Sequence, residues 1–213
     1  MVITMTKKER LAYIREGFEQ LYPDADCSLT YVDPWQLMVS AILATQCTDK
    51  RVNMVTPALF ERYPDVYAFA EANELELQEY IRSTGFYHNK AKNLIGAAKL
   101  IVTEYGGEVP DEIDELVKLP GVGRKIANLI VGDVYGKSAI VVDTHCKRIA
   151  YRMGFTKNTD PVKIEKDLRA FVPEDYGAKF CHQIVLLGRE YCVARKPKCN
   201  TCPLALWCKK AGV

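Results

Sequence analysis

Apolar side chains recur at helical spacing along almost the whole chain, and this pattern most constrains its fold. In residues 7–21, for example, Leu11, Ile14, Phe18 and Leu21 fall on one face of a helix. Glycine and proline residues separate further segments of this kind, which span residues 33–43, 50–63, 65–72, 74–83, 89–105, 112–119, 124–135, 143–153, 160–171 and 176–191. Because only residues 139–142 could form a strand, the sequence predicts an all-α protein.

Length and hydropathy exclude several classes of protein. A chain of 213 residues can bury a core as one large domain or two packed small ones. Its longest apolar runs, such as residues 94–100, are far too short to span a bilayer. The N-terminal apolar residues precede Lys7 and Lys8 instead of following a basic segment, which is not the pattern of a secretory signal. We therefore expect a cytoplasmic protein without membrane contact, whose thiols stay reduced.

A glycine-rich turn between two predicted helices is the most informative internal motif. Pro120 ends the first helix, Gly121 and Gly123 supply backbone freedom, and the second helix starts near Arg124. Backbone N–H groups of such a turn, with the positive end of the following helix, bind phosphate without reading base sequence. An ordinary helix–helix turn is the alternative, but two cations directly after G-x-G favour a DNA-binding helix-hairpin-helix element.

Two ionisable residues could carry chemistry next to this motif. Lys125 lies in the first turn of the second helix, whose positive end should lower the pKa of its amine and leave a neutral fraction able to attack carbon. A simple phosphate contact is the other reading of Lys125. Asp143 follows a short apolar segment and suits a helix N-cap, although the same carboxylate could also face a site. If close, Asp143 would oppose the shift in the pKa of Lys125.

Four cysteines near the C-terminus follow the spacing C-x6-C-x2-C-x5-C: Cys192, Cys199, Cys202 and Cys208. In a reducing compartment such a cluster indicates a metal site before a disulfide. Structural zinc sites use two close cysteine pairs, whereas only one is present here, and thiolates also suit iron–sulfur clusters. The spacing alone leaves both metals open. The remaining cysteines are expected to be buried as small apolar residues: Cys27, Cys47, Cys146 and Cys181.

The net charge of +2 conceals two basic stretches, residues 118–152 and 189–210. The second includes Arg195, Lys196 and Lys198, which lie between the cysteines and could offset thiolate charge or contact DNA phosphates. Because each basic stretch adjoins a special motif, their distribution indicates a polyanionic partner.

Together these motifs resemble the endonuclease III family, and the resemblance runs nearly end to end. It is carried by residues 44–49, 84–87, 119–127, 142–145 and 188–208. It implies a helix-hairpin-helix DNA glycosylase fold in which two helical domains flank a DNA-binding cleft. One is an iron–sulfur cluster domain of residues 1–26 and 138–213, and the other is a six-helix domain of residues 27–137.

The resemblance also implies an activity, a base-excision repair DNA glycosylase with AP lyase activity. It would remove oxidised pyrimidines from damaged double-stranded DNA, acting as a monomer. Lys125 would attack C1′ of the sugar, Asp143 would assist, and β-elimination would cleave the strand. The four cysteines would hold a structural [4Fe–4S] cluster.

Further DNA contacts are implied residue by residue. Gln46 would enter the space left by an extruded base, and the loop around Gly85 would wedge the opposite strand. Thr84 is less apolar than a wedge requires, so Phe86 could serve instead. The other expected DNA-contacting residues are Gly121, Gly123, Arg124, His145, Arg148, Arg195, Lys196 and Lys198. Two departures from the family pattern, Cys47 and Ile126, lie beside Gln46 and Lys125.

Three rival readings compete with this one. A mismatch-specific adenine glycosylase shares the hairpin, aspartate and cluster but lacks the lysine, so Lys125 argues against it. A non-catalytic DNA-binding module with a structural metal would use the hairpin only as a clamp. A zinc-bearing version of the same enzyme would be colourless, whereas an iron–sulfur protein absorbs visible light. Lesion preference and any redox role of the cluster cannot be read from the sequence.

Overall fold

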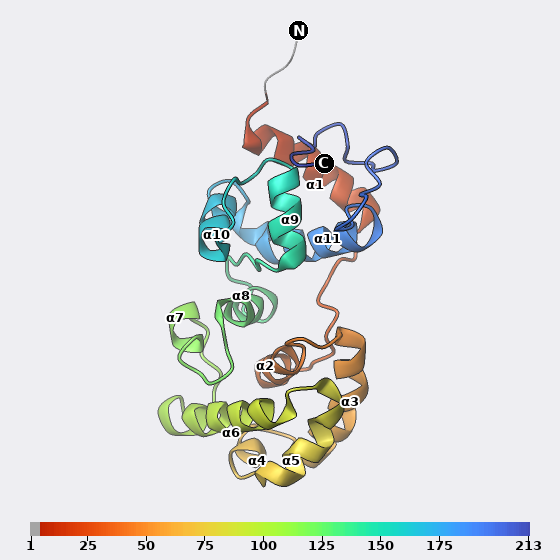
Figure 1. The fold of residues 1–213 in the computed structure, drawn as a ribbon. Helices are drawn as coiled ribbons and strands as arrows, with labels where there is room; N and C mark the ends of the chain where they lie inside the picture. The colour runs from red at the N-terminus through yellow and green to blue at the C-terminus, as the bar shows by residue number, and fades with distance from the viewer. Residues whose placement is uncertain (1–4) are drawn as a thin grey trace. The chain divides into compact units, whose positions relative to one another are not determined.

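A computed structural model describes residues 5–213, and the regular elements in this range are all helices (Figure 1). The predicted all-α fold is therefore confirmed, and residues 139–142 form an irregular segment in place of a strand. The chain divides into two compact units. One is continuous, Cys27–Tyr135, and the other combines the N-terminal segment through Asp26 with Gly136–Val213.

The continuous unit is organised around a helix that is buried on nearly all sides. Its helices are α2 (Pro34–Leu43), α3 (Asp49–Arg62), α4 (Val66–Ala70), α5 (Glu74–Ile81), η1 (Arg82–Thr84), α6 (Tyr87–Glu104), α7 (Ile113–Leu116) and α8 (Arg124–Asp133). Eight of the ten residues of α2 are buried, as expected for a helix that is apolar all round. Asp33 caps α2 by accepting a 2.7 Å hydrogen bond from the Gln36 amide, and Pro34 occupies the first position of the helix.

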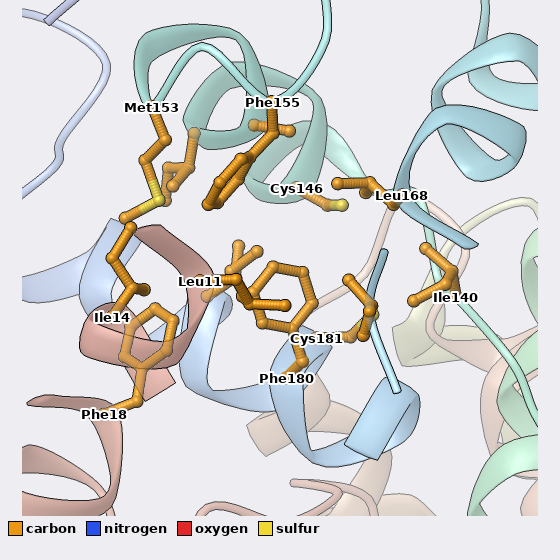
Figure 2. Packing of buried hydrophobic residues seen from close by; sticks show 14 of the residues in the cluster. Leu11, Ile14, Phe18, Ile140, Cys146, Met153, Phe155, Leu168, Phe180 and Cys181 are labelled. Carbon is orange, nitrogen blue, oxygen red and sulfur yellow. The ribbon is translucent and has the colours of Figure 1, made fainter. Parts of the chain in front are cut away.

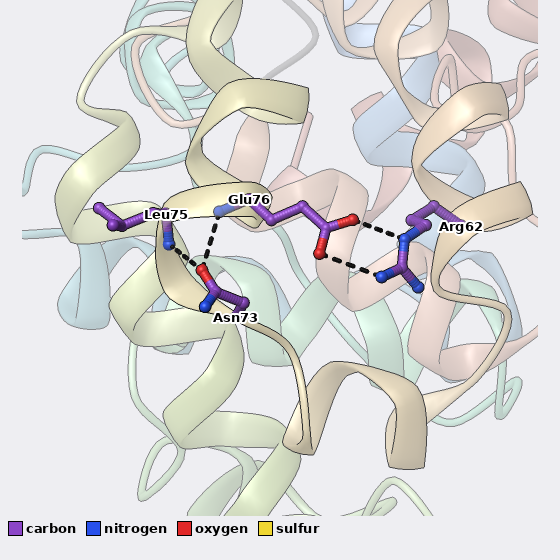
Figure 3. Close-up of polar contacts among 4 residues, drawn as sticks. All are labelled: Arg62, Asn73, Leu75 and Glu76. Atoms are coloured by element: carbon purple, nitrogen blue, oxygen red, sulfur yellow. Dashed lines mark hydrogen bonds and ion pairs between the residues drawn. The ribbon is translucent and has the colours of Figure 1, made fainter.

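Figure 3 shows how α5 is joined to α3 on the surface of this unit. The side chain of Asn73 caps α5 by accepting hydrogen bonds from the amides of Leu75 and Glu76, at 3.0 and 3.1 Å. Glu76 binds the Arg62 guanidinium through both carboxylate oxygens, at 2.6 and 3.0 Å. The hydrogen bonds from Arg62 lower the pKa of Glu76. One short polar segment thus starts a helix and ties it to a neighbour.

Several helix ends in this unit lie one to three residues from those predicted, and two of these differences have a clear local cause. Helix α6 begins at Tyr87 rather than Asn89, because Phe86 takes a left-handed conformation (φ 51°) and redirects the chain. Regular helix in α7 covers only Ile113–Leu116. The following residues form tight turns with i→i+3 hydrogen bonds, which lead directly into Pro120.

The other unit packs α1 (Lys7–Leu21) against helices from the C-terminal part of the chain. These are α9 (Thr144–Arg152), α10 (Pro161–Arg169), η2 (Glu174–Tyr176) and α11 (Gly177–Glu190). Figure 2 shows Leu11, Ile14 and Phe18 of α1 packed with Phe155 and Phe180, all five essentially inaccessible to solvent. Chain segments from both ends therefore share one core.

A buried arginine adds polar links between α1 and the later segments. Arg10 is 6% exposed and donates hydrogen bonds to the backbone carbonyls of Met153 at 2.6 Å, Trp207 at 3.1 Å and Gly154 at 3.4 Å. Burial lowers the pKa of its guanidinium. These bonds satisfy carbonyls after α9 and beside the last cysteine, so they hold the C-terminal loop to α1.

Candidate functional site

The predicted glycine turn lies between α7 and α8. Gly121 has φ +80°, and a Cβ atom built on it would lie 2.9 Å from Cβ of Asn93, so glycine is needed there for both conformation and space. Gly123 differs from the prediction: its φ of −90° is open to any residue, and no atom lies within 4 Å of a built Cβ. Its glycine instead leaves the start of α8 uncovered by a side chain.

Helix α8 presents an open N-terminus to a ligand. Gly123 is its N-cap and, as a glycine, has no side chain to cap the first turn. The inner face of α8 is buried through Ile126, Ala127 and Ile130, whereas Lys125 on the first turn is exposed. Free N–H groups and the helix dipole make such a helix end an anion-binding site. Lys125 lies beside this anion-binding site.

Two loops of the same unit hold the residues expected to probe the DNA stack. Gln46 lies between α2 and α3, is exposed, and has φ 55°. Gly85 and Phe86 follow η1 with φ of 72° and 51°, and the Phe86 side chain is 62% exposed. Thr84 is buried and its hydroxyl donates to the Ile81 carbonyl at 2.8 Å. Phe86, not Thr84, is therefore the residue able to touch a partner.

Asp143 belongs to the other unit and is the N-cap of α9, as its position in the sequence predicted. Its Oδ1 accepts a 2.7 Å hydrogen bond from the Cys146 amide. This bond fixes the side chain through one oxygen and leaves the second oxygen outside the cap. Cys146 and Cys181 are buried nearby in the core, as expected, whereas the other two isolated cysteines, Cys27 and Cys47, are only partly buried.

His145 and Arg148, expected to contact DNA, are built into the protein to different degrees. Arg148 donates to the carbonyls of Cys192 at 3.0 Å and Gly188 at 3.3 Å, and its Nη2 lies 3.2 Å from Nδ1 of His145. A Cβ on Gly188 would clash with His145 Nδ1 at 2.3 Å. Arg148 is thus a structural link between α9, α11 and the cysteine loop, and its DNA contact stays a prediction.

The four cysteines line one pocket beside the ends of α9 and α11. Apolar side chains such as Met153, Leu187 and Leu204 form the rest of its wall. Burial, together with the charges of the neighbouring cysteines, raises the pKa of Cys202 and Cys208. Four thiolates could share this pocket only around a cationic group.

Sulfur geometry in this pocket bears on the choice of metal. A structural zinc ion holds each thiolate at about 2.3 Å, which brings the four sulfurs to roughly 4 Å from one another. The chemistry of four thiols suits an iron–sulfur cluster as well as a zinc ion.

The loop between the cysteines carries exposed cations, and one arginine that the sequence did not single out. Arg195, Lys196 and Lys198 are exposed, and the Lys198 amide donates to the Tyr191 carbonyl at 2.9 Å to close the loop. Arg152 donates to the carbonyls of Val193 and Ala194 at 2.8 and 2.9 Å. In the sequence, Arg152 could have been noticed because it lies one helical turn after Arg148 on the same face of α9. Its contacts with Val193 and Ala194, however, depend on how the cysteine loop folds.

Comparisons with known proteins connect these features. Residues 39–174 match the family model described as HhH-GPD superfamily base excision DNA repair protein. The chain is 50% identical to endonuclease III of Synechocystis sp. over 97% of its own length and 94% of the relative's. It is also similar to a solved non-covalent endonuclease III–DNA complex (38% identity, TM-score 0.90) and to a trapped endonuclease III–DNA covalent intermediate (38%, 0.89), each covering 97% of both chains. No helix among residues 5–213 is long and apolar enough to cross a membrane.

Proposed function

The chain belongs to the endonuclease III family of base excision DNA repair proteins, and we propose that Lys125 and Asp143 are the residues through which it acts. It is a bifunctional enzyme, a DNA glycosylase with AP lyase activity. One observation supports the assignment of the nucleophile: Lys125 is an exposed lysine on the first turn of α8, beside the anion-binding site. The substrate we propose is an oxidised pyrimidine in duplex DNA.

The chemistry begins when the damaged base leaves the stack, because its C1′ atom is otherwise out of reach. The amides around Gly121 and Gly123 would hold a phosphate close to Lys125, which orients the sugar. The neutral amine of Lys125 attacks C1′, a C–N bond to lysine forms, and the bond to the base breaks. The base departs with a proton, and ring opening gives a Schiff base.

Strand cleavage follows from the same intermediate. The positively charged imine acidifies the hydrogen on C2′, and loss of that proton expels the 3′ phosphate. Hydrolysis of the imine then releases Lys125. Asp143 would stabilise the positive charge that develops on the sugar or help to deprotonate the lysine. Its anchoring by the Cys146 amide supports this role, because a fixed carboxylate needs no reorganisation during the reaction.

A metal centre fits the cysteine pocket, and we propose a [4Fe–4S] cluster. Cys192, Cys199, Cys202 and Cys208 would be its ligands, with no position left for a substrate. Bound there, the cluster would cross-link the last loop, and its role would be structural. Residues 1–26 and 138–213 would then form the cluster domain and residues 27–137 the hairpin domain.

The DNA contacts that we propose come from four segments. They are the hairpin with Arg124, the loop of Gln46, the loop of Gly85 and Phe86, and the cysteine loop with its three exposed cations. Helix-end and lysine contacts to phosphate supply affinity without sequence preference, as a repair enzyme requires. A protein of this kind would work as a monomer on damaged double-stranded DNA in the cytoplasm.

Borohydride trapping tests this function. The protein is incubated with duplex DNA containing one oxidised pyrimidine, and sodium borohydride reduces any imine to a stable adduct. Wild type should form the adduct, Lys125→Gln should form none, and Lys99→Gln, an exposed lysine on α6, should match wild type. Base release without an adduct or strand break would refute the lyase mechanism. Full turnover by Asp143→Asn would refute the role of that carboxylate.

A further inference from the structure

A buried lysine outside the reaction centre joins the two loops that probe DNA. Lys90 on α6 is 4% exposed, and its ammonium donates 2.8 Å hydrogen bonds to the backbone carbonyls of Leu43 and Thr84. No carboxylate of the continuous unit pairs with it among the ion pairs of the described residues. Burying a cation that only carbonyls bind costs desolvation free energy. An apolar side chain of similar shape at this position would avoid that cost, so stability alone does not explain a lysine here.

The two carbonyls are special because each ends a helix. Leu43 is the last residue of α2 and Thr84 is the last residue of η1, so both carbonyls lie where helical hydrogen bonds run out. A cation at a helix C-terminus is favourable for both the orphan carbonyl and the dipole. One ammonium thus satisfies two helix ends that are 41 positions apart in the sequence.

Each of these helix ends is followed, two or three residues later, by a non-glycine residue with left-handed backbone. Gln46 follows α2 with φ 55°, and Phe86 follows η1 with φ 51°. Non-glycine residues resist this conformation, so the surrounding structure must hold it. The Leu43 carbonyl that Lys90 binds lies three residues before Gln46.

Resting on the proposed function, we propose that Lys90 is a positioning residue for base extrusion. It holds the Gln46 loop and the Phe86 loop at a fixed distance from each other. As a result, Gln46 fills the space left by the extruded base at the same time as Phe86 wedges the opposite strand. Lys90 itself touches neither DNA nor the reacting atoms.

The experiment compares two substrates under single-turnover conditions, a duplex with an oxidised pyrimidine and a duplex with a preformed abasic site. The first requires a base to be extruded, and the second does not. Lys90→Met keeps the length of the side chain and removes its donors. We expect base release to fall roughly ten- to hundredfold, because small misplacements cost this much, while abasic-site cleavage falls less than about threefold.

Controls separate positioning from general destabilisation. Ile101→Ala, a buried change on the same helix, is expected to lower both activities equally. Lys90→Arg, which keeps charge and donors, should restore the ratio of the two rates toward wild type. Hydrogen exchange should quicken in residues 44–48 and 84–86 together in Lys90→Met and not in Ile101→Ala. An unchanged ratio of rates in Lys90→Met would overturn this inference alone, whereas a wild type inert on both substrates would overturn the proposed function too.

Discussion

The guanidinium of Arg152 donates a hydrogen bond to the sulfur of Cys192, with Nη1 and Sγ 3.4 Å apart. The same side chain binds the next two carbonyls of the loop, so the first cysteine of the pocket is held from the last turn of α9. Partners outside the ligand set commonly orient the ligands and tune a metal centre.

Removing this contact should loosen the proposed metal centre. In protein that carries the proposed cluster, Arg152→Met is expected to lose iron about ten- to hundredfold more readily to a chelator than wild type, because the Cys192 segment is no longer fixed. Visible absorbance and iron content report the loss. Lys147→Met, an exposed change on the same helix, is the matched control and should keep its iron. Equal iron retention in both variants would contradict the role of Arg152.

The two hairpin glycines should respond differently to alanine. Gly121→Ala forces a side chain into a left-handed position against Asn93, so the free energy of unfolding should drop by about 1–3 kcal/mol. Gly123→Ala meets no atom and needs no unusual φ, so stability should stay within about 1 kcal/mol of wild type. Chemical denaturation measures both.

DNA affinity gives the second half of this contrast. Gly123→Ala should weaken DNA binding in a fluorescence anisotropy assay although the fold stays intact, because the new methyl group covers the amides of the anion-binding site. Unaltered affinity would mean that DNA does not approach this turn.

Phe86→Ala should impair base release and leave stability nearly intact. The ring is mostly exposed, so the free energy of unfolding should change by less than about 0.5 kcal/mol. Loss of the wedge should slow release of an oxidised pyrimidine in single-turnover assays. Thr84→Val tests the alternative: its hydroxyl is buried and bonded to Ile81, so this change should alter stability and not the wedge. The reverse pattern would assign the wedge to Thr84.

The acid limb of the stability profile should depend on Asp167. Hydrogen bonds from the side chains of Thr156 and Asn158 hold the pKa of this carboxylate below its ordinary value. A depressed pKa contributes stability above the unfolded value of about 3.9, and this contribution is lost as pH falls through the folded pKa. Asp167→Asn should therefore flatten stability against pH below about pH 5. Thr156→Val should flatten it in part, since Asn158 still donates; an unchanged profile in both would exclude Asp167.

The cysteine loop should contribute to the salt dependence of DNA binding. Replacing one phosphate-contacting cation lowers the slope of log affinity against log salt by about 1. Lys198→Gln and Arg195→Gln should each show this, since both side chains are exposed on the loop. Lys163→Gln, exposed on α10, serves as the control. A slope equal to wild type in the loop variants would place DNA elsewhere.

Local signals predicted much of the fold. The starts of α2 and α9 can be predicted from Asp33, Pro34 and Asp143, because capping depends on only a few neighbouring residues. The start of α6 was missed because the left-handed Phe86 carries no glycine or asparagine signal. Gly123 was misjudged because glycine can be required for access rather than for conformation.

The candidate site divides in the same way. The cysteines, Lys125 and the hairpin are local motifs, so spacing revealed them. Lys90 and Arg10 gave no such signal, because each acts on carbonyls far away in the sequence. Only tertiary structure can pair such donors with their acceptors.

The mixing of both chain ends in one core sets an order for biosynthesis. The continuous unit can fold as soon as Tyr135 has left the ribosome, while α1 must wait for α11 and the cysteine loop. At translation rates of about 5–20 residues per second, this wait is roughly ten to forty seconds. During it the apolar face of α1 is uncovered, and a chaperone has a natural target there. The cysteine pocket is likewise completed only when Cys208 has been made, so a product truncated before Cys208 would lack one ligand of the proposed metal site.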